Sequence, residues 1–292
     1  MISRWSVFPF IFRAVVVVSA CGAFAVAGTA RAQSSHHETA GRPAARPVVA
    51  AGGLLAGIAT GQTTVVDLTY AINDHSPAWP GDDHPFSAKV VATPQKDGYF
   101  ARTFCTAEHY GTHMDAPAHF PPGTTTVDQI PPARLFGPAV VIDVRKEVAK
   151  DNDYRLTPER IAKWETAHGK IPAGAIVFLR TGWGTRWPNQ VLYRDMDDAG
   201  VMHFPGYSVA AAKALIARGV NAVGIDTLSI DYGPSKDFEV HRVTLPAGLF
   251  QLENVANLSM LPETGAFVVA APIKLEGGSG GPVRIFALAP SR

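Results

Sequence analysis

The sequence predicts a single α/β domain built around a substantial sheet. Runs typical of β-strands outnumber the helical segments. The 27 glycines and 23 prolines fall largely between those runs, where they suit shaped loops on a rigid scaffold. An apolar content of 47% and a charged content of 17% describe an ordinary globular protein. Because no internal repeat or charged linker follows residue 63, we expect one domain over residues 63–292.

Each expected element follows from a local signal. Helices are expected at three segments: Pro158–His168 begins after a threonine that can cap it, Val209–Arg218 lies between a capping serine and a glycine, and Glu253–Leu261 ends before a proline. Strands are expected where β-branched and aliphatic residues gather between turn-forming residues. These strands are Thr64–Ile72, Val90–Thr93, Ala139–Val144, Ala175–Arg180, Ala222–Asp226, Ala266–Ala271 and Arg284–Leu288.

Residues 1–32 carry the signals of a bacterial secretory signal peptide. Two arginines flank a short start, an apolar run follows from Ala14 to Gly28, and Ala30-Arg31-Ala32 is a small-x-small cleavage site. We expect cleavage after Ala32 and a periplasmic or secreted mature chain with no stable membrane span. Lipidation of Cys21, in a segment similar to a lipoprotein box, is the alternative. Residues 33–62, rich in Ala, Gly, Ser and Pro, are expected to form a flexible leader.

Charge and cysteine content narrow the class of protein further. Cleavage removes three of the 26 basic residues and no acid, which leaves 23 basic against 25 acidic residues. No basic cluster remains, so a nucleic-acid partner is not expected. Cys105 becomes the only cysteine, which excludes an intrachain disulfide. Burial of Cys105 as a small apolar side chain is favoured over a role as a reactive thiol.

The most informative feature is the run from His109 to His119, which holds three imidazoles and a carboxylate. These are ligand types that borderline divalent metals prefer. In an extended chain, His109 and His113 would lie roughly 13 Å apart, whereas two nitrogens on one ion are only ~4 Å apart. The chain must therefore fold back, and Gly111 permits it. Three of the ten histidines fall within these eleven residues, which a random distribution would rarely produce. We therefore predict a metal bound by His109, His113 and Asp115.

His119 lies four residues beyond Asp115, near this metal. It can trade protons with a metal-bound water near neutral pH, and we prefer the role of general base. A fourth ligand or an orienting group remains the alternative. If no protein group closes the metal shell, the open position indicates a catalytic rather than a structural site.

The pattern His-x-Gly-Thr-His-x-Asp-Ala-Pro-x-His resembles the highly specific signature of the metal-dependent cyclase family, which includes bacterial kynurenine formamidase and isatin hydrolase. The resemblance extends from about residue 65 to 290, almost the whole mature domain. Further matching blocks are Asp67-Leu68, Trp79-Pro80-Gly81-Asp82, Phe204–Ser208, Gly224–Asp231, Glu253–Leu258, Leu261-Pro262 and Gly278–Arg284.

The resemblance implies a mixed-sheet fold of the swivelling β/β/α type and a larger site. In the formamidase branch a second metal shares the signature aspartate and adds a His and a Glu, which fall on His241 and Glu253. The family's proton-transfer histidine falls on His119, and its substrate-stacking aromatic falls on Trp79. One or two Zn²⁺ or Mn²⁺ ions and a homodimer or homotetramer are expected.

These features predict hydrolysis of a small, aromatic amide such as an aryl formamide, by metal-activated water with a histidine base. A cyclic amide or lactone of the isatin type is the alternative substrate. A metal-dependent cyclase or lyase, and a non-catalytic periplasmic binding protein, are alternatives from other classes.

Several other residues remain open. Asp226, Ser229 and Asp231 follow a buried strand and either orient ligands or form a structural turn. Ser279 lies in a glycine-rich turn, but no helix or Lys-Ser/Thr pair follows, so a phosphate loop is rejected. A core or surface role is expected for His75, His84, His168, His203, Trp183 and Trp187.

Overall fold

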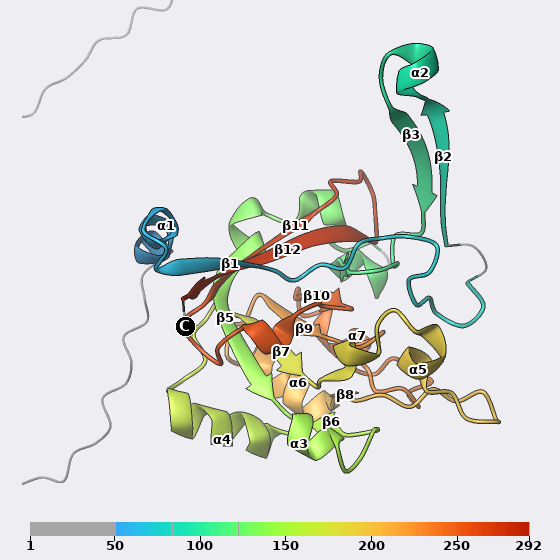
Figure 1. The fold of residues 1–292 in the computed structure, drawn as a ribbon. Coiled ribbons are helices and arrows are strands. Elements are labelled where there is room, and N and C mark those ends of the chain that lie inside the picture. The colour runs from blue at the N-terminus through green and yellow to red at the C-terminus, as the bar shows by residue number, and fades with distance from the viewer. Residues whose placement is uncertain (1–50, 83–84, 122, 292) are drawn as a thin grey trace, which may run out of the picture. The chain divides into compact units, whose positions relative to one another are not determined.

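The computed structural model describes residues 51–82, 85–121 and 123–291 (Figure 1). The predicted signal peptide, Cys21 and most of the predicted leader lie outside these residues. The strands are β1 Thr63–Asp67, β2 Phe86–Ala92, β3 Ala101–Thr106, β4 His113–Asp115, β5 Phe136–Asp143, β6 Arg155–Leu156, β7 Ile176–Arg180, β8 Gly206–Tyr207, β9 Ala222–Ile225, β10 Phe250–Glu253, β11 Phe267–Pro272 and β12 Gly280–Pro290. The helices are α1 Ala51–Ala59, α2 Pro94–Asp97, α3 Arg145–Val148, α4 Pro158–His168, α5 Gln190–Arg194, α6 Val209–Ile216 and α7 His241–Thr244.

An eight-stranded mixed sheet is the centre of the fold. Its order is β1-β12-β11-β5-β7-β9-β10-β4, and β4 also pairs with β12, which closes the last seven strands into a ring. Strands β5, β7, β9 and β10 are parallel, whereas β4, β11 and β12 join them in antiparallel pairs. The predicted α/β class with a mixed sheet is confirmed.

The two faces of this sheet bury separate cores. Along β5, Val140 and Ile142 join one core while Ala139 and Val141 join the other, as alternating side chains must. Burial on both faces explains why β5 and β7 are nearly continuous apolar runs. Helices α4 and α6 cover the first core, where Trp164 donates its indole N–H to the carbonyl of Val141 at 2.9 Å.

Two of the three predicted helices are confirmed. Helix α4 begins after Thr157, whose side chain accepts a hydrogen bond from the Arg160 N–H, and α6 begins after Ser208, which caps it in the same way. The helix predicted over Glu253–Leu261 is wrong. Glu253 ends strand β10, and only a short 3₁₀ turn follows at Leu258–Met260. Asn254 adopts φ 52°, in the left-handed region, which stops a right-handed helix there.

Three further expectations need correction. The strand expected over Thr64–Ile72 ends at Asp67. The flexible leader expected over residues 33–62 is wrong for Ala51–Ala59, which form α1 with Leu54 buried. Cys105, expected to be buried, is exposed. Within the described residues, no helix is long and apolar enough to cross a membrane.

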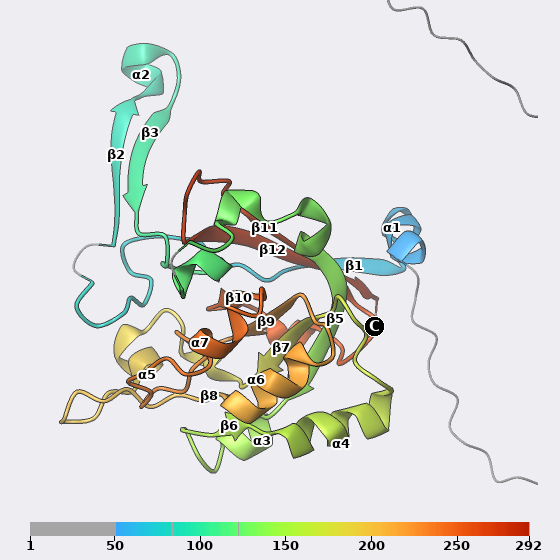
Figure 2. The same cartoon turned by 180° about the vertical axis from the view of Figure 1, so that it is seen from behind.

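Cys105 belongs to a separate hairpin of β2 and β3, which stands away from the eight-stranded sheet in Figures 1 and 2. Its apolar side chains are unusually exposed, with Tyr99 at 62%, Phe100 at 61% and Phe104 at 64% of their full accessible area. A two-stranded hairpin is marginally stable alone. Because these aromatic side chains are exposed, the hairpin offers an apolar surface against which another protein chain can pack.

Candidate metal centre

Neighbouring strands of the ring supply the first part of the site. In the antiparallel pair of β4 and β10, His113 lies directly opposite Glu253, so their side chains leave the sheet on the same face. Asp115 lies on that face too, because it is two residues from His113. Met114 between them points into the opposite core and is fully buried. The strand alternation thus turns both predicted ligands of β4 toward one side.

The fold-back predicted within the histidine run is present. Gly111 adopts φ 65°, the left-handed conformation that glycine tolerates. The turn returns the His109 ring to the strand, where Nδ1 lies 2.6 Å from Oδ1 of Asp115. His113 Nε2 approaches the same oxygen at 3.2 Å. The three predicted ligands of the first metal therefore converge.

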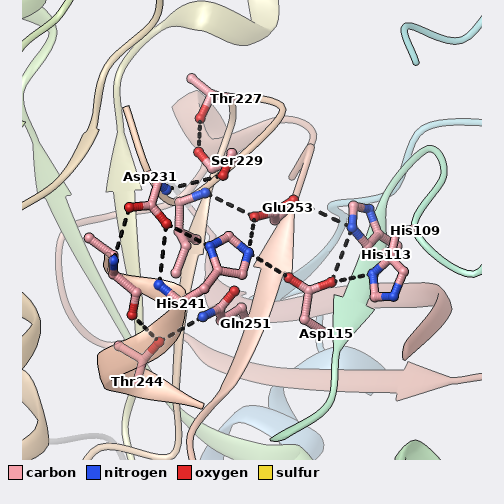
Figure 3. A network of polar contacts seen from close by, with 12 residues as sticks. His109, His113, Asp115, Thr227, Ser229, Asp231, His241, Thr244, Gln251 and Glu253 are labelled. Carbon is pink, nitrogen blue, oxygen red and sulfur yellow. Dashed lines mark hydrogen bonds and ion pairs between the residues drawn. The ribbon is translucent and has the colours of Figure 1, made fainter. Parts of the chain in front are cut away.

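His241 completes the cluster from helix α7 (Figure 3). Its Nε2 lies 3.3 Å from Oδ2 of Asp115 and 3.4 Å from Oε1 of Glu253. The other oxygen of Glu253 lies 3.4 Å from Nε2 of His113. Asp115 and Glu253 thus stand between the two imidazoles, and all five predicted metal ligands lie together.

The donor set fits one or two divalent ions. Two groups of donor atoms, from His109, His113 and Asp115 and from Asp115, His119 and His241, each lie within 4.8 Å of one another. Asp115 belongs to both groups, as a bridging carboxylate would. Its Oδ2 is buried and makes an ion-pair contact with His241 but no hydrogen bond, which is costly unless a cation satisfies it.

The electrostatics of the cluster also favour a bound cation. Burial lowers the pKa of His113, but hydrogen bonds and charge from Asp115 and Glu253 outweigh burial and raise it to about 10. The same balance, with Asp231 as a further partner, raises the pKa of His241. Burial raises the pKa of Asp115, yet the neighbouring histidines hold it well below its usual range. The two carboxylates therefore stabilise positive charge here, and a bound metal would displace these protons.

His119 lies in the 3₁₀ turn Pro117–His119 beside the cluster. Its ring stacks on His109 with centroids 3.9 Å apart and lies 5.9 Å from His241. Burial, aided by the repulsion of both neighbouring histidines, lowers its pKa to about 4. A neutral imidazole in this place can accept a proton, and its donor atom is also close enough to serve as a ligand. The geometry of His119 is therefore compatible with a general base and with a fourth metal ligand.

A cavity of about 230 Å³ opens onto the cluster. Trp79, the predicted stacking residue, lines it together with Phe120 and Phe238. The Phe238 ring lies 5.7 Å from each of the other two rings. Sequence reasoning missed both phenylalanines because no spacing or motif marks them. Phe238 adopts φ 51°, an uncommon conformation for an aromatic residue that tends to occur at functional sites.

The open residues after strand β9 divide by role. Asp231 Oδ2 accepts a hydrogen bond from Nδ1 of His241 at 2.6 Å, so it orients the ring of a predicted ligand. Ser229 lines the cavity. Asp226 instead accepts from the backbone N–H groups of Thr181 and Gly182 and holds a buried turn.

The remaining candidates stand apart from the cluster. Trp183 is buried in the core, and Trp187 stacks on Tyr70 with centroids 4.1 Å apart. His203 bonds to Asp153 at 2.8 Å on a half-exposed surface. His75 is exposed, His168 pairs with Glu263, and His84 lies outside the described residues.

Comparison with known proteins assigns the family. A family model described as “Putative cyclase” matches residues 66–232, more than half of the chain. The chain belongs to the cyclase family. Isatin hydrolase of Roseibium aggregatum is 34% identical, over 82% of this chain and 96% of the relative. Kynurenine formamidase of Paracidovorax citrulli is 29% identical, over 77% of this chain and 96% of the relative. The solved structure of isatin hydrolase A from Ralstonia solanacearum is similar with a TM-score of 0.76 at 35% identity, covering 85% of this chain and 100% of that one.

These relatives and the imidazole–carboxylate cluster identify the chain as a metal-dependent hydrolase of the cyclase family. The family, fold class and enzyme class predicted from the sequence are confirmed.

Proposed function

We propose that the enzyme hydrolyses a small aromatic amide, with a cyclic amide of the isatin type as the preferred substrate. The observation that carries this proposal is the cavity, which has the metal-type cluster on one side and three aromatic rings on another. A flat aromatic ring can stack on Trp79 while its carbonyl faces the cluster. The higher identity to isatin hydrolase favours the cyclic amide, and the kynurenine formamidase relative keeps an aryl formamide as the second candidate.

The residues have distinct roles in this proposal. His109, His113 and Asp115 hold the first ion, and His241 and Glu253 hold a second that shares Asp115. A bound ion supplies polarisation of the substrate carbonyl and a water of lowered pKa. His119 accepts a proton from the attacking water and returns it to the leaving nitrogen as the carbon–nitrogen bond breaks. The product then carries a new carboxylate and a free amine.

The native metal is proposed to be Zn²⁺ or Mn²⁺. Three imidazoles suit zinc, whereas the two carboxylates of Asp115 and Glu253 with added water also suit manganese. Two overlapping groups of donor atoms share Asp115, which supports one or two ions per subunit, and this occupancy is the quantity to measure.

We further propose a periplasmic or secreted enzyme that forms a homodimer or homotetramer. The signals in residues 1–32 support export. The exposed aromatic side chains of the β2–β3 hairpin support association between copies, since identical subunits are the commonest partners. Light scattering on the purified mature chain measures the assembly directly.

Turnover in isotopically labelled water tests the proposed reaction. The metal-loaded protein is assayed with isatin, an aryl formamide and an aryl lactone in ¹⁸O-labelled water, and the products are analysed by mass spectrometry. We expect isatin to be opened fastest, with one labelled oxygen in the product carboxylate. A product without label indicates a lyase or cyclase, and absence of turnover with all three substrates indicates a binding protein. Either result contradicts the proposal.

A further inference from the structure

Ser279, outside the predicted site, contacts the ring of His109, and Glu108 in turn contacts Ser279. Ser279 Oγ lies 2.9 Å from Nε2 of His109, on the side of the ring opposite Asp115. The same hydroxyl lies 2.6 Å from Oε2 of Glu108, which also accepts the Ser279 backbone N–H at 2.8 Å. Glu108, Ser279, His109 and Asp115 thus form one continuous chain of polar contacts.

Hydrogen-bond chemistry gives this chain a direction. A carboxylate only accepts, so the single hydroxyl proton of Ser279 is donated to Glu108. The hydroxyl oxygen then accepts from His109, which requires a proton on Nε2 of that ring. An imidazole protonated at Nε2 presents the lone pair of Nδ1 once a metal displaces any second proton. In this ring Nδ1 is the atom that faces Asp115.

The other two histidines are held the opposite way round. Nδ1 of His113 faces the carbonyl oxygen of Gly111 at 3.0 Å, and Nδ1 of His241 faces the Asp231 carboxylate at 2.6 Å. Both acceptors require a proton on Nδ1, which leaves Nε2 toward the cluster. His109 therefore needs a different hydrogen-bond partner, one that holds a proton on Nε2 and leaves Nδ1 toward the cluster.

The backbone around Ser279 is fixed against the site strand. The Ala116 N–H donates to the Ser279 carbonyl at 2.9 Å, and Gly280 pairs with Asp115 in the register of β12 and β4. A Cβ on Gly280 would lie 2.6 Å from Cε1 of His109, so only glycine allows the ring to sit this close. The glycine-rich segment thus positions the serine hydroxyl and makes room for the imidazole.

We propose that Glu108 and Ser279 are positioning residues that fix the tautomer of His109, so that Nδ1 rather than Nε2 binds the metal. This inference rests on the proposed function, because it assumes that the cluster binds a metal. Partners behind a metal-binding histidine typically contribute 10- to 100-fold in metal affinity. The glycine-rich segment around Ser279, which does not form a phosphate loop, thus has a role in positioning a predicted metal ligand.

Metal affinity measured with Zn²⁺ alone tests the inference. Demetallated full-length mature protein is titrated by calorimetry in competition with a chelator, as wild type and as Ser279→Ala, Glu108→Ala and His113→Ala. Ser87→Ala, on the exposed hairpin, is the matched serine control. We expect Ser279→Ala and Glu108→Ala each to weaken binding by about 10- to 100-fold, with Ser87→Ala unchanged. Combined with His109→Ala, Ser279→Ala should cause no further loss.

Long-range ¹H–¹⁵N NMR of the Zn²⁺-loaded, histidine-labelled protein supplies the second readout. The account predicts a proton on Nε2 of His109 and on Nδ1 of His113 and His241. A proton on Nδ1 of His109 would overturn the inference that Glu108 and Ser279 fix its tautomer. Equal Zn²⁺ affinity in Ser279→Ala and Ser87→Ala would overturn it too. In either case, loss of Zn²⁺ binding in His113→Ala would leave the proposed function standing. Failure of the wild type to bind Zn²⁺ overturns the proposed function itself. If Ser279→Ala does not fold, Glu108→Ala and the NMR assignment decide.

Discussion

Replacement of Asp231 by asparagine should weaken the half of the site built on His241. The Asp231 carboxylate accepts from His241 Nδ1 at 2.6 Å and from the backbone N–H groups of Val240 and His241 at 2.9 and 3.2 Å. Asp231→Asn keeps only one accepting oxygen: with this oxygen on Val240 the amide N–H₂ faces His241, and with it on His241 the amide N–H₂ faces the N–H of Val240. In the first arrangement the imidazole places its proton on Nε2, away from metal binding, and in the second the charge-assisted bond to Nδ1 becomes a neutral one.

The magnitude follows from the one charge-assisted hydrogen bond that is lost. Such a bond contributes about 2 kcal/mol, which corresponds to about 30-fold in affinity. Calorimetric titration of demetallated Asp231→Asn with Mn²⁺ measures this, and Asp74→Asn, at an exposed aspartate, is the control. Thermal unfolding separates a metal effect from a loss of fold. Mn²⁺ affinity equal to that of wild type would refute the reasoning that Asp231 orients His241.

Three further predictions follow from the site and the core. His119→Asn should lower kcat by about 10²- to 10⁴-fold with the metal content unchanged; loss of metal instead would make His119 a ligand. Trp79→Ala should raise KM for aromatic substrates by about 10-fold, since ring stacking contributes about 0.5–1.5 kcal/mol beyond the buried area, and Trp79→Phe should retain most of the affinity. Glu165→Gln should lower the free energy of unfolding by about 2 kcal/mol, because the buried carboxylate bonds to Arg218 at 2.8 and 2.9 Å. These bonds lower the pKa of Glu165 to about 2, so the stability is present above its unfolded value of 4.5 and is lost as the pH falls toward 2. Denaturant titrations of wild type and Glu165→Gln should therefore converge in acid; a constant difference would contradict this.

Local chemistry made the first half of the site predictable. The run from His109 to Asp115 contains its own ligands and its own turn, and Gly111 adopts the positive φ that the fold-back requires. The caps of α4 and α6 were equally local, because each lies within one helical turn of the helix that it begins.

The second half depends on contacts between distant segments. Glu253 reaches His113 through the register of β10 and β4, and no local pattern specifies that pairing. From the local sequence, Glu253 was expected to begin a helix, whereas the strand pairing with β4 decides its conformation. Only the family resemblance pointed to His241 and Glu253 together.

Neither the two phenylalanines of the cavity nor the contacts of Ser279 and Glu108 behind His109 could be predicted from the sequence. Phe120 and Phe238 meet only in the folded chain, and ring contacts carry no spacing rule. Ser279 is far from Glu108 in sequence, so the hydroxyl and the carboxylate are joined by the pairing of β12 with β4.

The most direct test of the central claim is hydrolysis measured while metal is returned to the demetallated enzyme. Isatin opening is followed as Mn²⁺ or Zn²⁺ is added stepwise, with wild type and His113→Ala side by side. The account predicts no turnover before metal is added, a rise that ends at one or two ions per subunit, and neither bound metal nor turnover in His113→Ala. Full hydrolysis by the metal-free protein would contradict it.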